Sequence, residues 1–170
     1  LTACGRAVTG QTVATEGYSV TDITGRTVHF DTPPQRIVTL SSTLDQIVLS
    51  VAPPERMAAV NASMKDPINS NMVEVAEQVE KTIQRPSVEY IVSLHPDIVL
   101  IADWQYLELA DPLRESGLNV VVGRGPHNLA EVRDLVRLTT DAIGESRRGD
   151  ILLRKMDEKL SEITEKVQSI

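Results

Sequence analysis

The ionisable side chains of this 170-residue chain predict no catalytic centre. Its three histidines, His29, His95 and His127, lie far apart in the sequence. The signatures Gly-x-Ser-x-Gly, His-Glu-x-x-His and Gly-x-x-x-x-Gly-Lys, which position a nucleophile, a zinc ion or a phosphate, do not occur. The run 123–125 follows a predicted strand, but Asn128 stands where a dinucleotide fingerprint has its third glycine. We therefore predict no catalytic residue.

Direct binding of a metal ion is disfavoured by the same scarcity. Near the predicted strand ends the chain offers only His127, Asp66 and Asp103, whereas a site for bare zinc or manganese needs several imidazole and carboxylate ligands. The single cysteine, Cys4, excludes a disulfide within the chain and a cysteine-based zinc site. We expect no metal ligand and no resident cofactor.

Aromatic and guanidinium groups on predicted loops suggest non-covalent binding instead. Trp104, the only tryptophan, directly follows a predicted strand and has polar neighbours, including Gln105. An exposed indole can stack on a flat macrocycle, catecholate or corrin; the alternative is an ordinary core tryptophan. Arg85 and Arg124 lie on predicted loops near the same cleft as Trp104, where their guanidinium donors can pair with carboxylate or catecholate oxygens of a ligand. Their alternative is a solvated surface charge.

Composition narrows the class of protein. A net charge of −7 argues against nucleic acid as a partner, because binding phosphates requires a basic surface. No apolar run approaches the roughly 20 residues that span a bilayer. A hydrophobic content of 41% supports a packed core, and branched aliphatic residues must build it because aromatic residues make up only 3% of the chain.

A helix–strand unit in the middle of the chain organises the predicted fold. The pattern of 88–93 predicts a short amphipathic helix that Ser87 can cap. This helix must end near Leu94 or His95, because the residue before a proline avoids helical backbone angles. The apolar, β-branched run 98–102 then predicts a parallel strand buried on both faces.

The neighbouring segments repeat this alternation of helices and strands. We predict an α/β fold, a three-layer lobe with a mostly parallel central sheet and an N-terminal β-hairpin. Ligands of such sheets bind at the carboxyl ends of the strands. The predicted elements are a hairpin at 18–30, strands at 37–40, 57–60, 98–102 and 120–122, and helices at 44–51, 72–79, 88–93, 104–116 and 129–143, with loops at 61–71 and 80–86. The candidate ligand-binding residues at or near the strand ends are Ser42, Asn61, Met64, Arg85, Trp104, Gln105 and Arg124.

The two ends of the chain differ from the lobe at 18–145. Residues 146–169 predict a helix of roughly 36 Å, which is long for a domain of this size. We therefore expect 146–170 to be an interdomain helix leading to a second lobe, apparently absent from this sequence. At the other end, Leu1–Gly5 resembles the lipobox of bacterial lipoproteins, which implies lipid on Cys4. The stretch 1–17 would then be a lipobox remnant and a flexible tether.

Four segments together carry a resemblance to a known family: the hairpin 20–28, the first strand 34–41, the helix-Pro-Asp-strand motif 88–100 and the helix–strand join 113–120. The chain is similar to the N-terminal lobe of class III periplasmic-type binding proteins, the substrate-binding lipoproteins of ABC importers for ferric siderophores, haem and cobalamin. It departs from the family at Asp45, near where many members carry a glutamate, and at 51–53, where Leu-Gly is usual.

The resemblance implies an extracytoplasmic binding protein, held at the membrane by its lipid only, that delivers a metal chelate to an ABC importer. In the family one long helix joins two lobes, and the ligand lies between them. A glutamate at the position of Glu89 docks the protein onto the permease. Two alternatives stay open: a flavodoxin-like enzyme or nucleotide-binding domain, and a standalone α/β interaction module.

Overall fold

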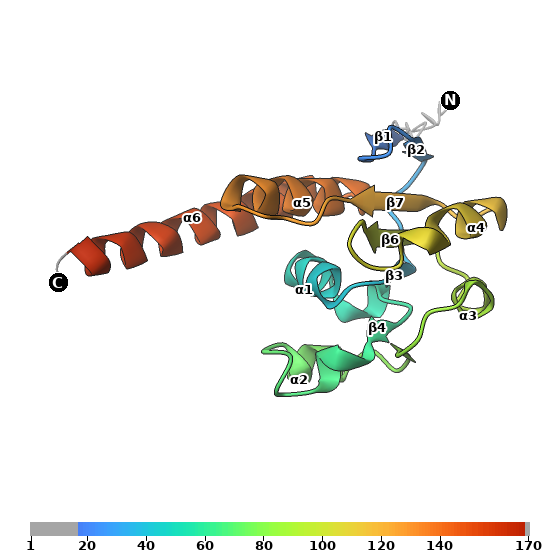
Figure 1. The fold of residues 1–170 in the computed structure, drawn as a ribbon, viewed down its shortest axis with the longest axis horizontal. Helices are drawn as coiled ribbons and strands as arrows, with labels where there is room; N and C mark the ends of the chain where they lie inside the picture. The colour runs from blue at the N-terminus through green and yellow to red at the C-terminus, as the bar shows by residue number, and fades with distance from the viewer. Residues whose placement is uncertain (1–16, 169–170) are drawn as a thin grey trace, which may run out of the picture.

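The protein is a three-layer α/β lobe from which one long helix projects (Figure 1). The computed structural model describes residues 17–168. The predicted lipid-attachment residue, Cys4, and nearly all of the predicted tether therefore lie outside the described residues. The α/β fold class, the parallel sheet, the N-terminal hairpin and the long C-terminal helix are confirmed.

The central sheet is parallel, and its middle strand is the predicted apolar run. Strands β3 (Ile37–Thr39), β6 (Ile98–Ala102) and β7 (Val120–Gly123) pair in the order β3-β6-β7. Every residue of β6 is buried. Because side chains alternate across a strand, β6 sends Ile98 and Leu100 to one core cluster and Val99 and Ile101 to the other. An unbroken apolar sequence is what a strand covered on both faces requires.

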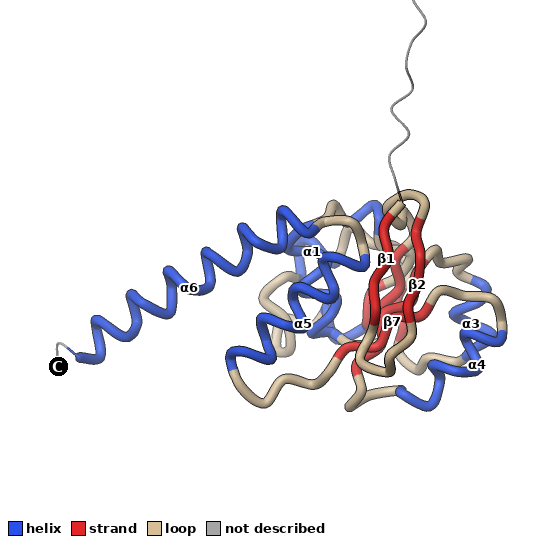
Figure 2. Tube along the Cα trace, turned by 90° about the horizontal axis from the view of Figure 1, so that it is seen from above, coloured by secondary structure: helices blue, strands red, loops and turns tan. Residues whose placement is uncertain are grey.

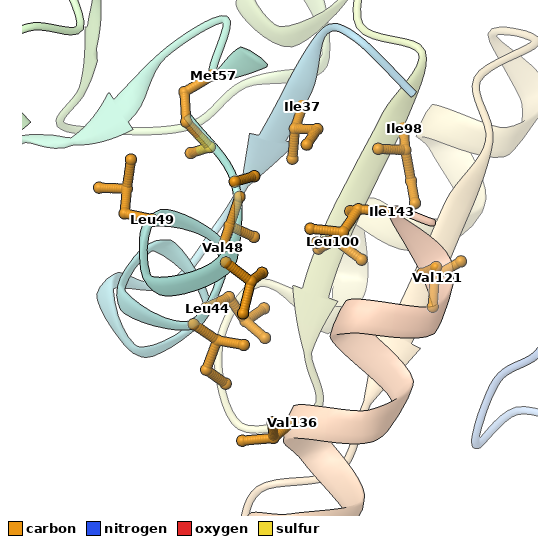
Figure 3. Packing of buried hydrophobic residues seen from close by; sticks show 14 of the residues in the cluster. Ile37, Leu44, Val48, Leu49, Met57, Ile98, Leu100, Val121, Val136 and Ile143 are labelled. Atoms are coloured by element: carbon orange, nitrogen blue, oxygen red, sulfur yellow. The ribbon is translucent and has the colours of Figure 1, made fainter. Parts of the chain in front are cut away.

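Helices complete the two outer layers. On one face, α1 (Ser42–Val51) and α5 (Leu129–Ala142) pack against the sheet, as the labelled side chains of these elements show (Figure 3). On the other face lie α3 (Val88–Ser93) and α4 (Ala110–Glu115). The hydroxyl oxygen of Ser87 accepts a hydrogen bond from the Tyr90 amide at 3.2 Å, so the predicted cap of α3 is confirmed.

A short strand pair extends the sheet beyond β3. Strands β4 (Val60–Asn61) and β5 (Thr82–Ile83) pair in parallel, and Met57 bridges to Ile37. The strand predicted at 57–60 is thus reduced to its end, and β5 lies inside a predicted loop. The helix predicted at 72–79 keeps only one turn, α2 (Val73–Ala76). Short 3-10 helices fill the connections: η1 (Pro54–Arg56), η2 (Ala62–Lys65) and η3 (Leu107–Leu109).

The helix predicted at 104–116 is wrong in its first part. Tyr106 has a left-handed backbone with φ of 61°, which ends any helix that includes Trp104. Only η3 and α4 follow. The helical spacing of Leu107, Ala110 and Leu113 predicts that all three face inward, but Leu107 is exposed. Ala110 and Leu113 are buried as predicted. Gly117 ends α4 with φ of 85°, a conformation that glycine adopts without strain.

The predicted hairpin is present and covers the outer edge of β7. It consists of β1 (Tyr18–Thr21) and β2 (Thr27–Phe30), which pair antiparallel and lie beside β7 (Figure 2). Its turn holds the strand edge, since the amide of Ile23 donates to the carbonyl of Val122. The buried carboxylate of Asp22 accepts from the Val122 amide at 3.0 Å and from Arg114 at 2.8 Å.

Helix α6 (Ser146–Gln168) leaves the lobe along α5 and then runs on alone (Figures 1 and 2). Gly144, with φ of 74°, makes the turn between the two helices. The start of α6 is fixed by the buried guanidinium of Arg56, which donates to the carbonyl oxygens of Pro34 and Ile143 and to Glu145. No helix within residues 17–168 combines the length and the apolar composition needed to cross a membrane.

Candidate functional site

The carboxyl ends of the parallel strands form one row at the edge of the sheet. Pairing and the Met57–Ile37 bridge give the spatial order β5-β4-β3-β6-β7. This order places six of the seven candidate residues along what we call the strand-end row: Arg85, Asn61, Ser42, Trp104 with Gln105, and Arg124. Parallel strands present backbone ends and loops on this side, which is where α/β proteins bind ligands.

Trp104 is the most exposed aromatic side chain of the row, with 47% of its surface accessible. The alternative of a core tryptophan is therefore wrong. Its indole lies against Gly125, where a Cβ atom would come within 2.7 Å of Cε3. Asp103 joins the loop after β6 to the loop after β7, since its Oδ1 accepts a hydrogen bond from the Gly125 amide at 2.7 Å. The contact holds the ring without burying it, so that much of its surface stays open to solvent.

The polar members of the row are also open to solvent. Gln105, Arg85 and Arg124 are exposed. Within the described part of the chain, neither guanidinium has a hydrogen bond or ion pair to another residue. Arg124 also lines a cavity of about 260 Å³ between the hairpin and α5, together with Ile23 and Leu135. Both arginines keep all their donors available for an external anionic group.

Of the candidates near α1, two reach the row and one does not. Ser42 and Asn61 are half-buried at the ends of β3 and β4. Met64 is wholly buried, because η2 turns its side chain into the core and places the sulfur 3.9 Å from the Ser70 hydroxyl. A residue with no accessible surface cannot contact a ligand. The prediction of Met64 as a ligand-binding residue is therefore wrong.

A buried, hydrogen-bonded carboxyl group lies behind the row, and the sequence analysis gave it no role in the site. Asp45 on α1 is fully buried and lies within 2.8 Å of donors from Thr39 and Asn61. Burial raises the pKa of its carboxyl from 3.8 to about 7, and these hydrogen bonds only partly oppose the rise. The available signal was a carboxylate between Leu44 and Ile47, on the apolar stripe of a predicted helix.

The histidines do not assemble into a site. His127 lies at the end of β7, with 85% of its side chain exposed, and its Nδ1 is 3.1 Å from Glu131. The amide of His127 also donates to this carboxylate, and the contact lowers the Glu131 pKa. His95, with φ of 50°, follows the end of α3, which stops near Leu94 as predicted. Among residues 17–168 no group of three His, Cys, Asp or Glu side chains is placed to hold a metal ion.

Glu89, the residue to which the resemblance gives the docking role, lies in the first turn of α3 and is exposed. The buried face of α3 is formed by Ile91, which belongs to the core cluster beneath the sheet. Since α3 leads into β6, its first turn lies toward the strand-end side of the lobe. The helix dipole also favours a carboxylate at this position.

Comparisons with known proteins agree with this architecture. Residues 37–170 match the family described as periplasmic binding protein. An uncharacterized ABC transporter substrate-binding lipoprotein of Bacillus subtilis (strain 168), YvrC, is 25% identical over 162 residues, which is 92% of this chain and 50% of that protein. The chain therefore spans about half the length of this curated relative.

Solved structures show the same fold at low sequence identity. SirA of Staphylococcus aureus, complexed with staphyloferrin B, superposes with a TM-score of 0.72 at 19% identity, covering 89% of this chain and 51% of SirA. A periplasmic heme binding protein of Pseudomonas aeruginosa gives a TM-score of 0.67 at 16% identity, covering 80% of this chain and 48% of that protein. With the family match over most of the chain, the conclusion is that this chain belongs to the periplasmic binding protein family.

Proposed function

We propose that this chain is the ligand-binding lobe of an extracytoplasmic substrate-binding lipoprotein, anchored through Cys4, that delivers a metal chelate to an ABC importer. The chelate would be a ferric siderophore, haem or cobalamin. Support comes from the family match and from the Bacillus subtilis relative, which is named as a substrate-binding lipoprotein. Of the similar solved structures, SirA is complexed with staphyloferrin B, and the Pseudomonas aeruginosa protein is named as heme binding. Binding without catalysis fits the strand-end row, where no nucleophile and base are paired.

The observation that carries the proposal is the seated indole of Trp104. Its ring rests on the Gly125 backbone and keeps nearly half its surface open at the end of the central strand. A flat π-surface held in this way can stack on a porphyrin, a corrin or a catecholate. The unpaired guanidinium groups of Arg85 and Arg124 lie along the same row and suit carboxylate or catecholate oxygens. This combination favours a flat, anionic chelate.

A single wall is insufficient for tight binding. Small-molecule sites bury most of the ligand surface, whereas the members of this row are exposed or half-buried. We therefore propose that a second lobe, joined through α6, supplies the opposite wall. The stiff start of α6, held by Arg56 and Glu145, would keep the two walls facing each other.

Docking onto the permease is assigned to Glu89. Its carboxylate is exposed on the strand-end side of the lobe and makes no hydrogen bond or ion pair within the described residues. A permease arginine could pair with it in a charge-assisted contact. The same surface would then face the membrane partner while the chelate lies between the lobes.

The test is a binding panel of haemin, ferrioxamine B, a ferric catecholate and cyanocobalamin, with FMN and ATP as controls. Native mass spectrometry of the protein with both lobes should show sub-micromolar binding of at least one chelate and none of either nucleotide. Trp104→Phe keeps a flat ring and should retain most of the affinity, whereas Trp104→Ala should not. Binding of FMN or ATP without any chelate would refute the proposal.

The same panel tests whether two walls are needed. The 170-residue chain alone should bind each chelate only weakly, with quenching of Trp104 fluorescence above micromolar concentrations. Sub-micromolar binding to this chain alone would show that one wall suffices and would remove the argument for a second lobe.

A further inference from the structure

A carboxyl group replaces backbone pairing between the ends of β3 and β4. The Ala58 amide donates to the Ile37 carbonyl at 2.9 Å, but two residues later the Val60 amide donates to the carbonyl of Lys81, the residue before β5. The following amide, that of Asn61, donates to the Asp45 side chain at 2.8 Å. Asp45 therefore occupies the place where the two strands separate, and it ties their ends to helix α1.

The side chain of Asn61 is held by the same carboxyl. Its Nδ2 lies 2.5 Å from Asp45 Oδ2, which also accepts the Asn61 backbone amide. Nδ2 further lies 3.3 Å from the carbonyl oxygen of Thr39. One oxygen of the carboxyl thus fixes both the backbone and the amide group of Asn61 at the strand-end row.

The other oxygen of the carboxyl lies in a network that can accept a proton. Thr39 Oγ1 is 2.6 Å from Asp45 Oδ1 and 3.0 Å from the Ser41 carbonyl, but a hydroxyl has only one hydrogen to donate. When Asp45 is ionised, Thr39 can donate to Oδ1. When Oδ1 carries a proton, it can donate to Thr39, which then donates to Ser41. Both protonation states are therefore satisfied by rotating one hydroxyl.

Asn61 offers an unused acceptor on the other side. Within residues 17–168 its Oδ1 has no hydrogen-bond partner. Because no buried side-chain oxygen or nitrogen in that range lacks a partner, this atom must reach solvent. The carbamoyl group is thus anchored through nitrogen to Asp45 and presents its oxygen at the row, where it can accept from an N–H or O–H group of a ligand.

Among residues 17–168, the side-chain partners of Asp45 are Thr39 and Asn61, and no charged side chain contacts it. Helix α1 packs against β3, β4, β6, η2, α5 and α6. On η2 and the residue after it, Lys65 donates to the Val79 carbonyl, and Asp66 accepts from Ile68 and Asn69. On α5 and α6, three arginines have partners other than Asp45. Arg133 pairs with Asp157 and Arg137 with Asp134, whereas Arg148 contacts Glu145 and the Val51 carbonyl. Burial raises the carboxyl pKa to about 7, so both states exist near neutral pH.

We propose that Asp45 is a positioning residue that holds Asn61 at the strand-end row, and that gain or loss of its proton changes how the Asn61 carbamoyl group is held toward a donor group of the chelate. The ligand part of this inference rests on the proposed function. The ionised carboxyl is the stronger acceptor, so it holds both nitrogens of Asn61 more firmly than the protonated form.

Nuclear magnetic resonance of this chain tests the coupling without any ligand. In the wild type, the Asp45 carboxyl carbon and both amide signals of Asn61 should titrate with a common midpoint near 7, and the Asn61 protons should move downfield as pH rises. In Asp45→Asn the Asn61 signals should not shift over the same range. Wild-type Asn61 signals that stay constant, or that follow a different midpoint from the Asp45 carbon, would overturn the inference even if the variant does not fold.

Binding measurements on the two-lobed protein test the consequence. Cyanocobalamin carries amide N–H donors and haemin with ionised propionates carries none. Asn61→Ala removes one neutral hydrogen bond, so the affinity of the variant for cyanocobalamin should be roughly 2- to 10-fold lower than that of the wild type. Its affinity for haemin should be unchanged. An equal loss for both probes would refute the donor–acceptor role. If no chelate binds at all, the proposed function fails, whereas the NMR titration still decides the role of Asp45.

Discussion

Replacing Asp45 by asparagine should change how the stability of the lobe depends on pH. Folding raises the pKa of the Asp45 carboxyl from 3.8 to about 7, because burial disfavours its charged form. At about 1.36 kcal/mol per unit, the linked free energy is at most about 4 kcal/mol. The native state binds this proton more tightly than the unfolded chain does. Its contribution is therefore fully present below pH 3.8 and is lost as pH rises through about 7.

Asparagine is a suitable replacement because it imitates the protonated acid. Its oxygen can accept from the two nitrogens of Asn61, and its amide can donate to the hydroxyl of Thr39. The variant should therefore be destabilised little near pH 4. As pH rises toward 8, wild type should lose stability relative to the variant by up to about 4 kcal/mol.

Urea denaturation followed by circular dichroism, at half-unit steps between pH 4 and 8, measures this difference. Other carboxyl groups contribute equally to both proteins and cancel in the subtraction. Asp150→Asn, at an exposed site on α6, is the matched control and should leave the wild-type curve unchanged. Parallel curves for wild type and Asp45→Asn would show that Asp45 does not change its ionisation on folding, and the reasoning would be wrong.

The remaining predictions concern the exposed residues of the site. Trp104→Ala should change the free energy of unfolding by less than about 1 kcal/mol, because the ring is half exposed. Its chelate affinity, measured by calorimetry, should fall about tenfold or more. A large shift in melting temperature would instead make Trp104 a structural residue. Gly125→Ala should displace the indole, since the new Cβ would lie 2.7 Å from Cε3, and should shift the emission of Trp104 and weaken binding; an unchanged spectrum contradicts the seating. Glu89→Arg should leave chelate affinity intact but weaken capture by the reconstituted importer, because a charge-assisted contact is worth roughly 1.5–3 kcal/mol; unchanged uptake would return Glu89 to an ordinary helix-start residue.

The fold could be predicted where a pattern is local. The β-branched run of β6, the alternation of the hairpin and the stripe of α3 each record their burial in consecutive residues. Strand β5 has only two residues, which is too short for any periodicity. The error at 104–116 arose because nothing in the sequence marks Tyr106 as left-handed; its conformation depends on the turn after β6.

The site divides in the same way. That Trp104 would be exposed followed from its place after a buried strand, since loops at strand ends lie at the surface. The burial of Met64 could not be predicted, because it depends on η2 turning back toward the core. The role of Asp45 required tertiary partners from β3 and β4, residues that lie 6 and 16 positions away in the sequence. A polar residue on an apolar helix face signals such a network but does not identify its partners.

The two halves of the strand-end row are positioned by different means, and this has a consequence for binding. Trp104 is placed by contacts between the loops after β6 and β7, within the central sheet. Asn61 is placed by a side chain from α1, whose carboxyl end is joined to α6 through Arg148 and the Val51 carbonyl. Helix α6 packs against both α1 and α5, and α5 directly follows the loop that contains Gly125. A shift of α6 relative to the lobe therefore has a path to the indole as well as to Asn61.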